Sequence, residues 1–308
     1  MVGVVGAGAY ATRYLLPALG AAGAGVRAIA SAGGVSAAHA AAKFDIPLAT
    51  TDVETILSDA SIDTVVIATR HDTHAALVER ALSAGKHVWV EKPLALEREE
   101  IARIEKAYES ARRRNPATVL MVGFNRRFAP HVGKLRQLLE PLKEPKVFLM
   151  TVNAGAVPQD HWTRDPAVGG GRILGEACHF IDLLRYLAGA PSTALEATRL
   201  DADAAILNLS FADGSRGAIH YLTNGHRSIA KERLEVFCGG RAAQLENFRR
   251  LRGHGWPGFH SMNLWRQNKG QREAVAAFVE AIRNGRPSPI PFAQIVEVAG
   301  LTVEAAAR

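Results

Sequence analysis

Short apolar runs alternate with amphipathic stretches over the first part of the chain. Continuously apolar runs, typical of strands covered on both faces, occur at residues 2–5, 26–30, 64–68, 87–90 and 118–122. Helical periodicity separates these runs, at residues 10–21, 36–44, 52–58, 74–84 and 96–113. This alternation predicts an α/β Rossmann domain, a doubly wound parallel sheet, over residues 1–123.

The pattern changes after Asn125. Helices are predicted at residues 129–139, 173–188 and 270–284, and strands at residues 146–153, 194–200, 204–211, 216–223 and 233–237. The pairs Asp213-Gly214 and Gly239-Gly240 have the composition of hairpin turns. We therefore expect residues 124–308 to form an α+β domain with a mostly antiparallel, open-faced sheet.

A glycine-rich turn leads from the first strand into the first helix, with the sequence Gly6-Ala7-Gly8-Ala9-Tyr10-Ala11. Gly6 would permit a tight turn, Gly8 would let the backbone approach a pyrophosphate, and Ala11 would allow close helix–strand packing. The free N–H groups of the helix start favour a phosphate at this place. The stretch predicts a dinucleotide site, and the alternative is a merely tight turn.

The end of the second strand bears on the choice of dinucleotide. An acidic residue there usually binds the ribose hydroxyls of NAD, but this chain continues with Ser31, Ala32, Gly33 and Gly34. A carboxylate would repel a 2′-phosphate, and Ser31 can donate a hydrogen bond to one. The sequence leans slightly toward NADP over NAD, with no nearby arginine to strengthen the preference.

Composition narrows the classes of partner. The formal net charge of +7 suits an anionic ligand, whereas no basic run with interleaved aromatic residues indicates nucleic acid. Two cysteines make no disulfide framework, and the histidines lack metal-ligand spacing, so neither a disulfide nor a metal is expected. The low number of cysteines favours a reducing, cytoplasmic location, and no apolar run reaches 18 residues, so we expect no membrane span.

Several motifs together resemble the Gfo/Idh/MocA family, named for glucose–fructose oxidoreductase, inositol dehydrogenase and a rhizopine-catabolism protein. They are the glycine-rich turn, residues 84–87 leading into Glu91-Lys92-Pro93, residues 123–128, the triple glycine 169–171 running into residues 179–182, and residues 281–285. The resemblance covers nearly the whole chain. It also extends to two-domain oxidoreductases in which an alcohol-dehydrogenase-like unit precedes this fold.

The resemblance implies that Lys92 sits beside the nicotinamide and contacts the substrate hydroxyl. A lysine at the carboxyl end of a parallel strand does point into the ligand crevice. Pro93, cis in the family, would fix the turn that aims it. The expected cofactor-binding residues around this place are Ala68, Thr69, Arg70, His74, Glu91, Lys92 and Pro93. The plainer alternatives are a Lys92–Glu91 pair and a structural role for His74 at its helix start.

A second constellation surrounds His179, the candidate general base or acid. Sugar dehydrogenases of the family carry an aspartate four residues before this histidine, where the present chain has Gly175. Glu176, three residues before, can share a helix face with His179 and so replace the missing acid, or it can point elsewhere. Asp182 could orient the imidazole. A core histidine is the alternative role for His179.

Other substrate candidates lie in predicted loops. Asn125 and Arg126 follow the strand 118–122 and would contact the substrate or a neighbouring subunit, and His161 and Trp162 would close over the substrate. Lys269 is either a further candidate or a solvated lysine. Apolar and polar residues alternate along 204–211, so an uncovered sheet face predicts a homodimer or homotetramer.

The function expected from these features is an NAD(P)-dependent oxidoreductase. It would transfer hydride between the nicotinamide and a carbinol carbon of a sugar, cyclitol or nucleotide-sugar, with Lys92 and His179 acting on the oxygen and its proton. Because Gly175 replaces the aspartate, reduction of C=N bonds and internal recycling of NAD stay open. A non-catalytic dinucleotide sensor is the alternative from another class.

Overall fold

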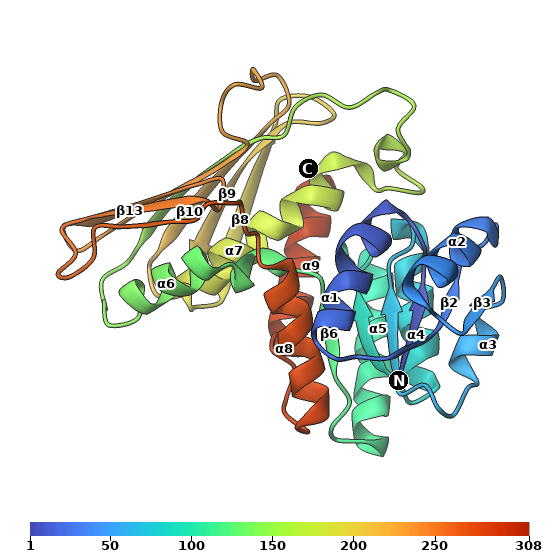
Figure 1. The fold of residues 1–308 in the computed structure, drawn as a ribbon. Helices are drawn as coiled ribbons and strands as arrows, with labels where there is room; N and C mark the ends of the chain where they lie inside the picture. The colour runs from blue at the N-terminus through green and yellow to red at the C-terminus, as the bar shows by residue number, and fades with distance from the viewer. Residues whose placement is uncertain (308) are drawn as a thin grey trace. The chain divides into compact units, whose positions relative to one another are not determined.

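The computed structural model describes residues 1–307 (Figure 1). Contacts divide the chain into two compact units. The first unit joins Met1–Gly123 with Gln271–Ala299, and the second joins Phe124–Gly270 with the described residues from Gly300 onward. Met1–Gly123 covers the same residues as the predicted Rossmann domain. Gln271–Ala299, which we expected to belong with residues 124–308, instead makes its contacts with the first unit.

The first unit contains a six-stranded sheet whose neighbouring strands all run parallel. Its strands are β1 (Val2–Val5), β2 (Val26–Ala30), β3 (Leu48–Thr50), β4 (Thr64–Ile67), β5 (His87–Val90) and β6 (Leu120–Val122). Their order is β3-β2-β1-β4-β5-β6, the doubly wound order predicted from the alternating pattern. Every residue of β1 and β4 is buried, which accounts for their continuously apolar sequence apart from Thr64.

Helices alternate with these strands along the chain. They are the π-helix η1 (Ala11–Leu15), α1 (Leu16–Ala21), α2 (Val35–Phe44), α3 (Glu54–Leu57), the 3₁₀ helix η2 (His71–Thr73), α4 (His74–Ser83) and α5 (Arg98–Arg114). The unit also contains α8 (Gln271–Arg283) and the part of α9 (Phe292–Ala307) up to Ala299, which come after the last strand of the chain. In α5 the buried residues Ile101, Ile104 and Tyr108 recur at helical spacing. At its end Arg114 donates to the carbonyl oxygens of Leu82 and Ser83, satisfying the last turn of α4.

The second unit contains an eight-stranded, mostly antiparallel sheet. Its strands are β7 (Val147–Asn153), β8 (Ser192–Arg199), β9 (Ala205–Phe211), β10 (Arg216–Leu222), β11 (Glu232–Cys238), β12 (Arg241–Glu246), β13 (Arg250–His254) and β14 (Ser261–Asn263). The order is β14-β13-β12-β11-β7-β10-β9-β8, and β7–β10 is a parallel pair while the other neighbours are antiparallel. The predicted fold class is therefore confirmed.

One face of this sheet is covered within the second unit. Figure 1 shows α6 (Pro130–Leu139) and α7 (Cys178–Ala188) along the same face, and the short helices η3 (Asn125–Phe128), η4 (Trp162–Arg164) and η5 (Ile173–Ala177) complete the unit. In β9, Ala205, Leu207 and Leu209 are buried whereas Asn208 is exposed. The expected alternation of a covered and an open face is thus present.

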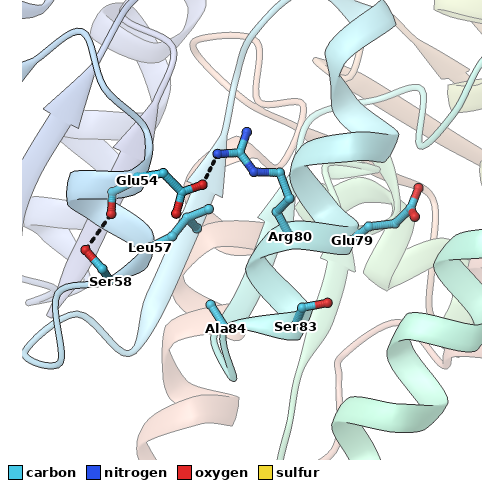
Figure 2. A pocket seen from close by; sticks show the side chains of 7 residues that line it. All are labelled: Glu54, Leu57, Ser58, Glu79, Arg80, Ser83 and Ala84. Carbon is cyan, nitrogen blue, oxygen red and sulfur yellow. Dashed lines mark hydrogen bonds and ion pairs between the residues drawn. The ribbon is translucent and has the colours of Figure 1, made fainter.

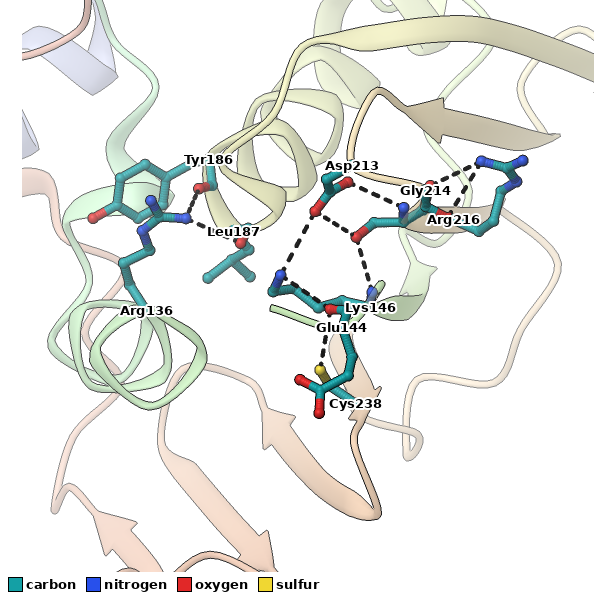
Figure 3. Close-up of polar contacts among 10 residues, drawn as sticks. Arg136, Glu144, Lys146, Tyr186, Leu187, Asp213, Gly214, Arg216 and Cys238 are labelled. Carbon is teal, nitrogen blue, oxygen red and sulfur yellow. Dashed lines mark hydrogen bonds and ion pairs between the residues drawn. The ribbon is translucent and has the colours of Figure 1, made fainter. Parts of the chain in front are cut away.

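The predicted turn at Asp213 and Gly214 joins β9 to β10 and is fastened to the start of β7 (Figure 3). Gly214 has a φ of 85°, which favours glycine. Asp213 accepts hydrogen bonds from the amide of Ser215 at 3.0 Å and from its hydroxyl at 2.9 Å. The amide of Lys146 donates to the same hydroxyl at 2.8 Å. These contacts fix where the parallel β7–β10 pair begins.

Among residues 1–307, no helix combines the length and the apolar composition needed to cross a membrane.

Candidate functional site

Residues that we predicted to bind a cofactor lie along the carboxyl edge of the first sheet. β1, β2, β4 and β5 are parallel, so the residues that follow them meet at one edge. These residues are Gly6 after β1, Ser31 after β2, Ala68 after β4 and Glu91 after β5. The strand order reverses between β1 and β4, and ligands of doubly wound sheets bind at such a switch point.

Gly6 occupies a place where no side chain fits. Its φ is 104°, and a Cβ on it would lie 2.3 Å from the carbonyl oxygen of Ala68. The amide of Ala68 in turn donates to the carbonyl oxygen of Val5 at 2.7 Å. The two chain segments at the switch point are therefore in direct backbone contact, which is the tight turn that the sequence predicts.

Gly8 has the opposite surroundings. A Cβ built on Gly8 would meet no atom of the protein within 4 Å, and the backbone there is not left-handed. Ala9 and Tyr10 follow in helical conformation, while Ala11 is 1% exposed against the sheet. Open space beside a glycine at a helix start fits the pyrophosphate of a dinucleotide, because N–H groups and the positive end of the helix dipole face it.

Ser31 lies where the adenosine end of a dinucleotide is expected. Its hydroxyl accepts a hydrogen bond from the amide of Ala37 at 3.1 Å and lies 2.9 Å from the hydroxyl of Ser36. The contact between the two hydroxyls uses one of their two protons. Residues 31–36, directly after β2, therefore contain this pair of hydroxyl groups and no carboxylate.

His74 braces the loops at this edge from inside the first unit. It is 0% exposed, and its Nδ1 lies 2.7 Å from the carbonyl oxygen of Pro93 while its Nε2 lies 3.4 Å from that of Thr69. Burial lowers the pKa of His74 to about 4, so the imidazole is neutral and carries one N–H. The shorter contact fits Nδ1–H donating to Pro93. His74 thus ties the loop after β4 to the turn after β5.

Glu91 braces the same turn through a buried carboxyl group. Its Oε1 accepts a hydrogen bond from Nε1 of Trp89 at 3.1 Å. A Cβ on Gly123 would lie 2.7 Å from that oxygen, so a glycine is needed to admit the carboxyl group. Burial raises the pKa of Glu91 to about 7, although the charge of Lys92 and hydrogen bonds from Trp89 and the Lys92 amide oppose the shift.

The turn itself presents Lys92, whose side chain is neither fully buried nor fully exposed. The Lys92–Pro93 peptide bond is cis, as the resemblance implies. Of the remaining predicted residues here, Ala68 and Thr69 are partly exposed, and Arg70 is exposed directly before η2. The structure therefore brings all the predicted cofactor residues of the first unit to one edge, with His74 and Glu91 behind it.

His179 lies in the first turn of α7 in the second unit. It is 7% exposed, and its ring packs edge-on against Phe124 with the centroids 6.4 Å apart. The preceding turn, η5, is a π-helix that contains Gly175 and Glu176. Such turns within helices are frequent at functional sites. Glu176 has a side chain that is 35% exposed and lies one turn before His179 on the same continuous helical segment.

The carboxylate of Glu176 belongs to a network that the sequence does not reveal. Tyr221 of β10 donates a hydrogen bond to its Oε2 at 2.7 Å. Arg172, with a side chain that is 3% exposed, donates to the same Tyr221 hydroxyl at 2.8 Å. Tyr221 reads as an ordinary core position of an alternating strand, and only the fold brings it beside Glu176.

Buried ion pairs engage the charged residues expected near the substrate. Arg127 donates to both carboxylate oxygens of Asp182, which is 0% exposed, so the structure pairs Asp182 with Arg127. Arg126 donates two hydrogen bonds of 2.9 Å to Glu232. Lys269 lies 2.6 Å from Glu232 with a side chain that is 17% exposed, so it is not the solvated lysine that was one alternative.

The charge on Glu232 is stabilised by these partners. Burial alone would raise the pKa of Glu232, but Arg126 and Lys269 outweigh it and lower the pKa to about 2. The side-chain amide of Asn125 donates to the backbone carbonyl oxygen of Lys269 at 2.7 Å, so Asn125 is bound to the same group of residues. Nothing in the sequence pattern around Glu232 signals this cluster.

His161 and Trp162 lie at the start of η4, ahead of the triple glycine. Their rings stack with centroids 6.0 Å apart, and Nδ1 of His161 lies 2.7 Å from the hydroxyl of Thr163. His161 is exposed and Trp162 partly so. Their proposed contact with substrate stays a prediction.

A separate surface pocket lies away from the carboxyl edge of the first sheet. Figure 2 shows its lining, which consists of Glu54, Leu57, Ser58, Glu79, Arg80, Ser83 and Ala84. Arg80 forms an ion pair with Glu54 across it. Because α4 runs from the end of β4 back to the start of β5, its last turn faces the amino edge. The pocket contains none of the predicted site residues.

Within residues 1–307, no three histidine, cysteine, aspartate or glutamate side chains gather closely enough to hold a metal ion. Cys178 and Cys238 are both buried, and no disulfide bond joins them.

Comparison with known protein families decides the relationship. Residues 1–137 match the Gfo/Idh/MocA model described as an oxidoreductase family with an NAD-binding Rossmann fold. Residues 136–257 match the C-terminal alpha/beta domain of the same family. The chain belongs to the Gfo/Idh/MocA family of oxidoreductases.

Named relatives of this Gfo/Idh/MocA chain are dehydrogenases of cyclitols and sugars. Inositol 2-dehydrogenase of Rhizobium meliloti is 29% identical over 306 residues, covering 92% of this chain and 88% of that protein. Myo-inositol 2-dehydrogenase of Thermotoga maritima is 26% identical, covering 80% and 78%. The solved complex of levoglucosan dehydrogenase with NADH and levoglucosan is 25% identical, has a TM-score of 0.85, and covers 99% of this chain and 96% of that one.

Proposed function

We propose that this Gfo/Idh/MocA protein is an NAD(P)-dependent dehydrogenase that acts on a carbinol carbon of a sugar, cyclitol or nucleotide-sugar. The observation that carries the proposal is the convergence of two features on one sheet edge. The open position at Gly8, after β1, is suited to a pyrophosphate, and the turn at Lys92 follows β5, which is separated from β1 only by β4 in the same sheet. The names of the relatives support the substrate class.

Each residue of the proposed mechanism has a distinct task. A nicotinamide dinucleotide, when bound, supplies the hydride acceptor. Gly6, Gly8 and the start of the following helix hold its phosphates. Lys92, presented by a turn that His74 and Glu91 brace, stabilises the reacting oxygen. His179 takes the hydroxyl proton during oxidation or returns it during reduction, and a positioned proton carrier of this kind contributes roughly 10² to 10⁴-fold in rate.

The charged residues of the second unit receive a different part in the proposal. Asp182 and Arg126 are engaged in buried pairs with Arg127 and Glu232. We therefore assign them to the support of the helix and loop that carry His179 and Asn125, and not to direct contact with substrate. His161, Trp162 and Asn125 stay as proposed substrate contacts.

We propose NADP as the slightly preferred cofactor. The support is the hydroxyl pair of Ser31 and Ser36 after β2, in a position where NAD-specific proteins usually carry an acid. An uncharged hydroxyl can donate to a 2′-phosphate and does not repel it. The absence of an arginine from residues 31–36 keeps the preference small.

The open face of the second sheet is proposed to bury itself in a homodimer or homotetramer. Val147, Leu149 and Phe237 are each more than two-fifths exposed, although they are large and apolar. Val147 and Leu149 line a shallow pocket together with Ala218 and with the charged residues Glu196 and Arg216. Exposed apolar surface of this kind is typical of an interface. A cytoplasmic location is proposed with it, because the two cysteines form no disulfide bond with each other.

One observation keeps a second reaction class under consideration. Gly175 stands where the resemblance implies an aspartate, so C=N reduction or internal recycling of NAD is the alternative chemistry for the same fold. A non-catalytic dinucleotide sensor is the alternative without chemistry. Turnover with a panel of polyols distinguishes the proposed dehydrogenase from both alternatives.

The test is a survey with NAD and NADP against myo-inositol, levoglucosan and D-xylose, followed by nucleotide-sugars. We expect reduced nicotinamide to accumulate in proportion to enzyme with at least one of them. Tight dinucleotide binding without any turnover would support the sensor and contradict the proposal. Net reduction of an imine, with no oxidation of any polyol, would support the second class.

A further inference from the structure

Glu176 is the residue next to the position at which the family resemblance implies an aspartate, and the structure shows how the Glu176 carboxylate is held. Four residues before His179 the chain has Gly175, which carries no side chain. Glu176 follows in the same π-helical turn, and its side chain is 35% exposed. An exposed glutamate on a helix normally keeps its rotamers free, but this one contacts two buried side chains from other positions.

The donors and acceptors in this network have fixed directions. The guanidinium of Arg172 can only donate, and its Nη2 and Nε lie 2.8 Å and 3.2 Å from the hydroxyl oxygen of Tyr221. That oxygen is therefore an acceptor toward Arg172. The single hydroxyl proton of Tyr221 goes to Oε2 of Glu176, 2.7 Å away. The hydroxyl of Tyr221 thus accepts from Arg172 and donates to Glu176. If the hydroxyl proton turned away, the hydrogen bond to Glu176 would be lost.

The charges favour the ionised form of Glu176. Nη2 of Arg172 lies 3.6 Å from Oε2 of Glu176, and the Arg172 side chain is only 3% exposed. Burial raises the pKa of Tyr221, and the nearby Glu176 charge raises it further, so Tyr221 keeps its proton. A donated hydrogen bond and an adjacent cation both stabilise a carboxylate.

We propose that Arg172 and Tyr221 are positioning residues that hold Glu176 ionised as the acceptor for a second substrate hydroxyl, next to the one on which His179 acts. This inference rests on the proposed dehydrogenase function. Glu176 and His179 lie in adjoining π-helical and α-helical turns of one segment, so we place each of them on one of two adjacent substrate hydroxyls. The inferred substrate class is therefore a polyol with a vicinal diol at the oxidised carbon.

A purely structural role for the network is the competing explanation. Arg172 also donates to the carbonyl oxygen of Gly155 at 3.2 Å, so the network ties a loop to η5. A structural role predicts equal loss of activity on every substrate when the network is cut. A role in recognition predicts a loss that depends on whether the substrate carries the second hydroxyl.

The test compares wild type with Tyr221→Phe on two substrates. They are the polyol oxidised fastest among myo-inositol and levoglucosan, and its monodeoxy analogue without the neighbouring hydroxyl. For the polyol, Tyr221→Phe should lower kcat/KM roughly 10-fold or more, mainly through KM, because a hydrogen bond to a charged group is weakened. For the analogue the change should be less than about 2-fold by the same reasoning. Tyr108→Phe is the matched control, since Tyr108 stacks on Phe292 in the first unit.

Glu176→Gln is the second variant, for use if Tyr221→Phe does not fold. The amide oxygen still accepts from Tyr221, so the network persists without the negative charge. We expect the same substrate-dependent loss, again mainly through KM. Equal losses on both substrates would overturn the inference while leaving the proposed function intact. A folded wild type that binds NAD(P) but oxidises no polyol would overturn the proposed function, and the inference with it.

Discussion

A Cβ on Gly6 would lie 2.3 Å from the carbonyl oxygen of Ala68, whereas a Cβ on Gly8, two residues later, would meet nothing within 4 Å. The first glycine is required by the fold itself. The second leaves space that only a ligand would need. This contrast separates a structural from a functional substitution within one short turn.

Gly8→Val should abolish the binding of NAD and NADP while the protein stays folded. The Cβ of the new side chain would meet no protein atom within 4 Å, and the side chain would stand where the backbone approaches the pyrophosphate. Nicotinamide fluorescence titration and thermal unfolding measure the two properties. Gly20→Val is the matched control, because a Cβ there also meets nothing within 4 Å. Unchanged nucleotide affinity in a folded Gly8→Val protein would rule out the site.

Ser31→Asp should shift the preference toward NAD. The carboxylate would repel a 2′-phosphate and accept from a 2′-hydroxyl, so the ratio of the Kd for NADP to that for NAD should rise at least about 10-fold. Ser58→Asp adds the same charge after α3 and should leave the ratio unchanged. A ratio that does not move in Ser31→Asp would show that the adenosine end lies elsewhere.

Glu91 and His74 should give opposing pH dependences of stability. The pKa of Glu91 is raised from 4.5 to about 7, so the unfolded chain ionises first and folding stability falls as pH rises through that range. The pKa of His74 is lowered from 6.5 to about 4, so the unfolded chain binds a proton first and stability falls as pH drops through that range. Each contribution amounts to about 3 kcal/mol.

Glu91→Gln removes one of these contributions and leaves the other. The free energy of unfolding of the variant relative to wild type should therefore increase by about 3 kcal/mol between about pH 4.5 and pH 7. Urea unfolding of both proteins at several pH values measures this difference, in which unrelated titrations cancel. A difference that is constant with pH would show that Glu91 is ionised throughout and that its turn is held in another way.

Leu149→Arg should weaken the proposed self-association. Leu149 is 41% exposed on the open sheet face, and a charge there would be buried at an interface. Light scattering should give a multiple of 33.0 kDa for wild type and a smaller mass for the variant at the same concentration. Ile229→Arg, in the loop after β10, is the control at an exposed apolar residue. A wild-type mass of one chain at micromolar concentration would contradict the proposal.

The parallel sheet of the first unit, within residues 1–123, could be predicted largely from sequence because its signals are local. Strands buried on both faces must be continuously apolar, and the Gly6 turn has to be a glycine wherever it occurs. The three-residue β3 was not predicted, since so short a run carries no pattern. β13 was missed for a different reason. Arg250 and Arg252 flank Leu251 on a strand whose outer face is open, so its average character is polar.

The network around the second candidate site depends on contacts between distant segments, which a single sequence does not show. Tyr221 and Glu176 are 45 residues apart, and Arg126 and Glu232 are 106 apart. Asp182 illustrates the limit of local spacing. Local spacing pairs it with His179, three residues before, whereas the partner that the fold brings to its buried carboxylate is Arg127, 55 residues earlier in the chain. Its proposed role in orienting the imidazole stays a prediction.

The central claim is that this chain moves hydride from a carbinol carbon to a nicotinamide with the help of Lys92 and His179. The most direct measurement uses myo-inositol or levoglucosan deuterated at its carbinol carbons, together with oxidised cofactor. Mass spectrometry of the reduced nicotinamide should show one transferred deuterium with wild type. Lys92→Ala and His179→Ala should each slow its appearance by roughly 10²-fold or more, while nucleotide affinity stays near that of wild type. Absence of deuterium from the nicotinamide, or full transfer by Lys92→Ala, would contradict the account.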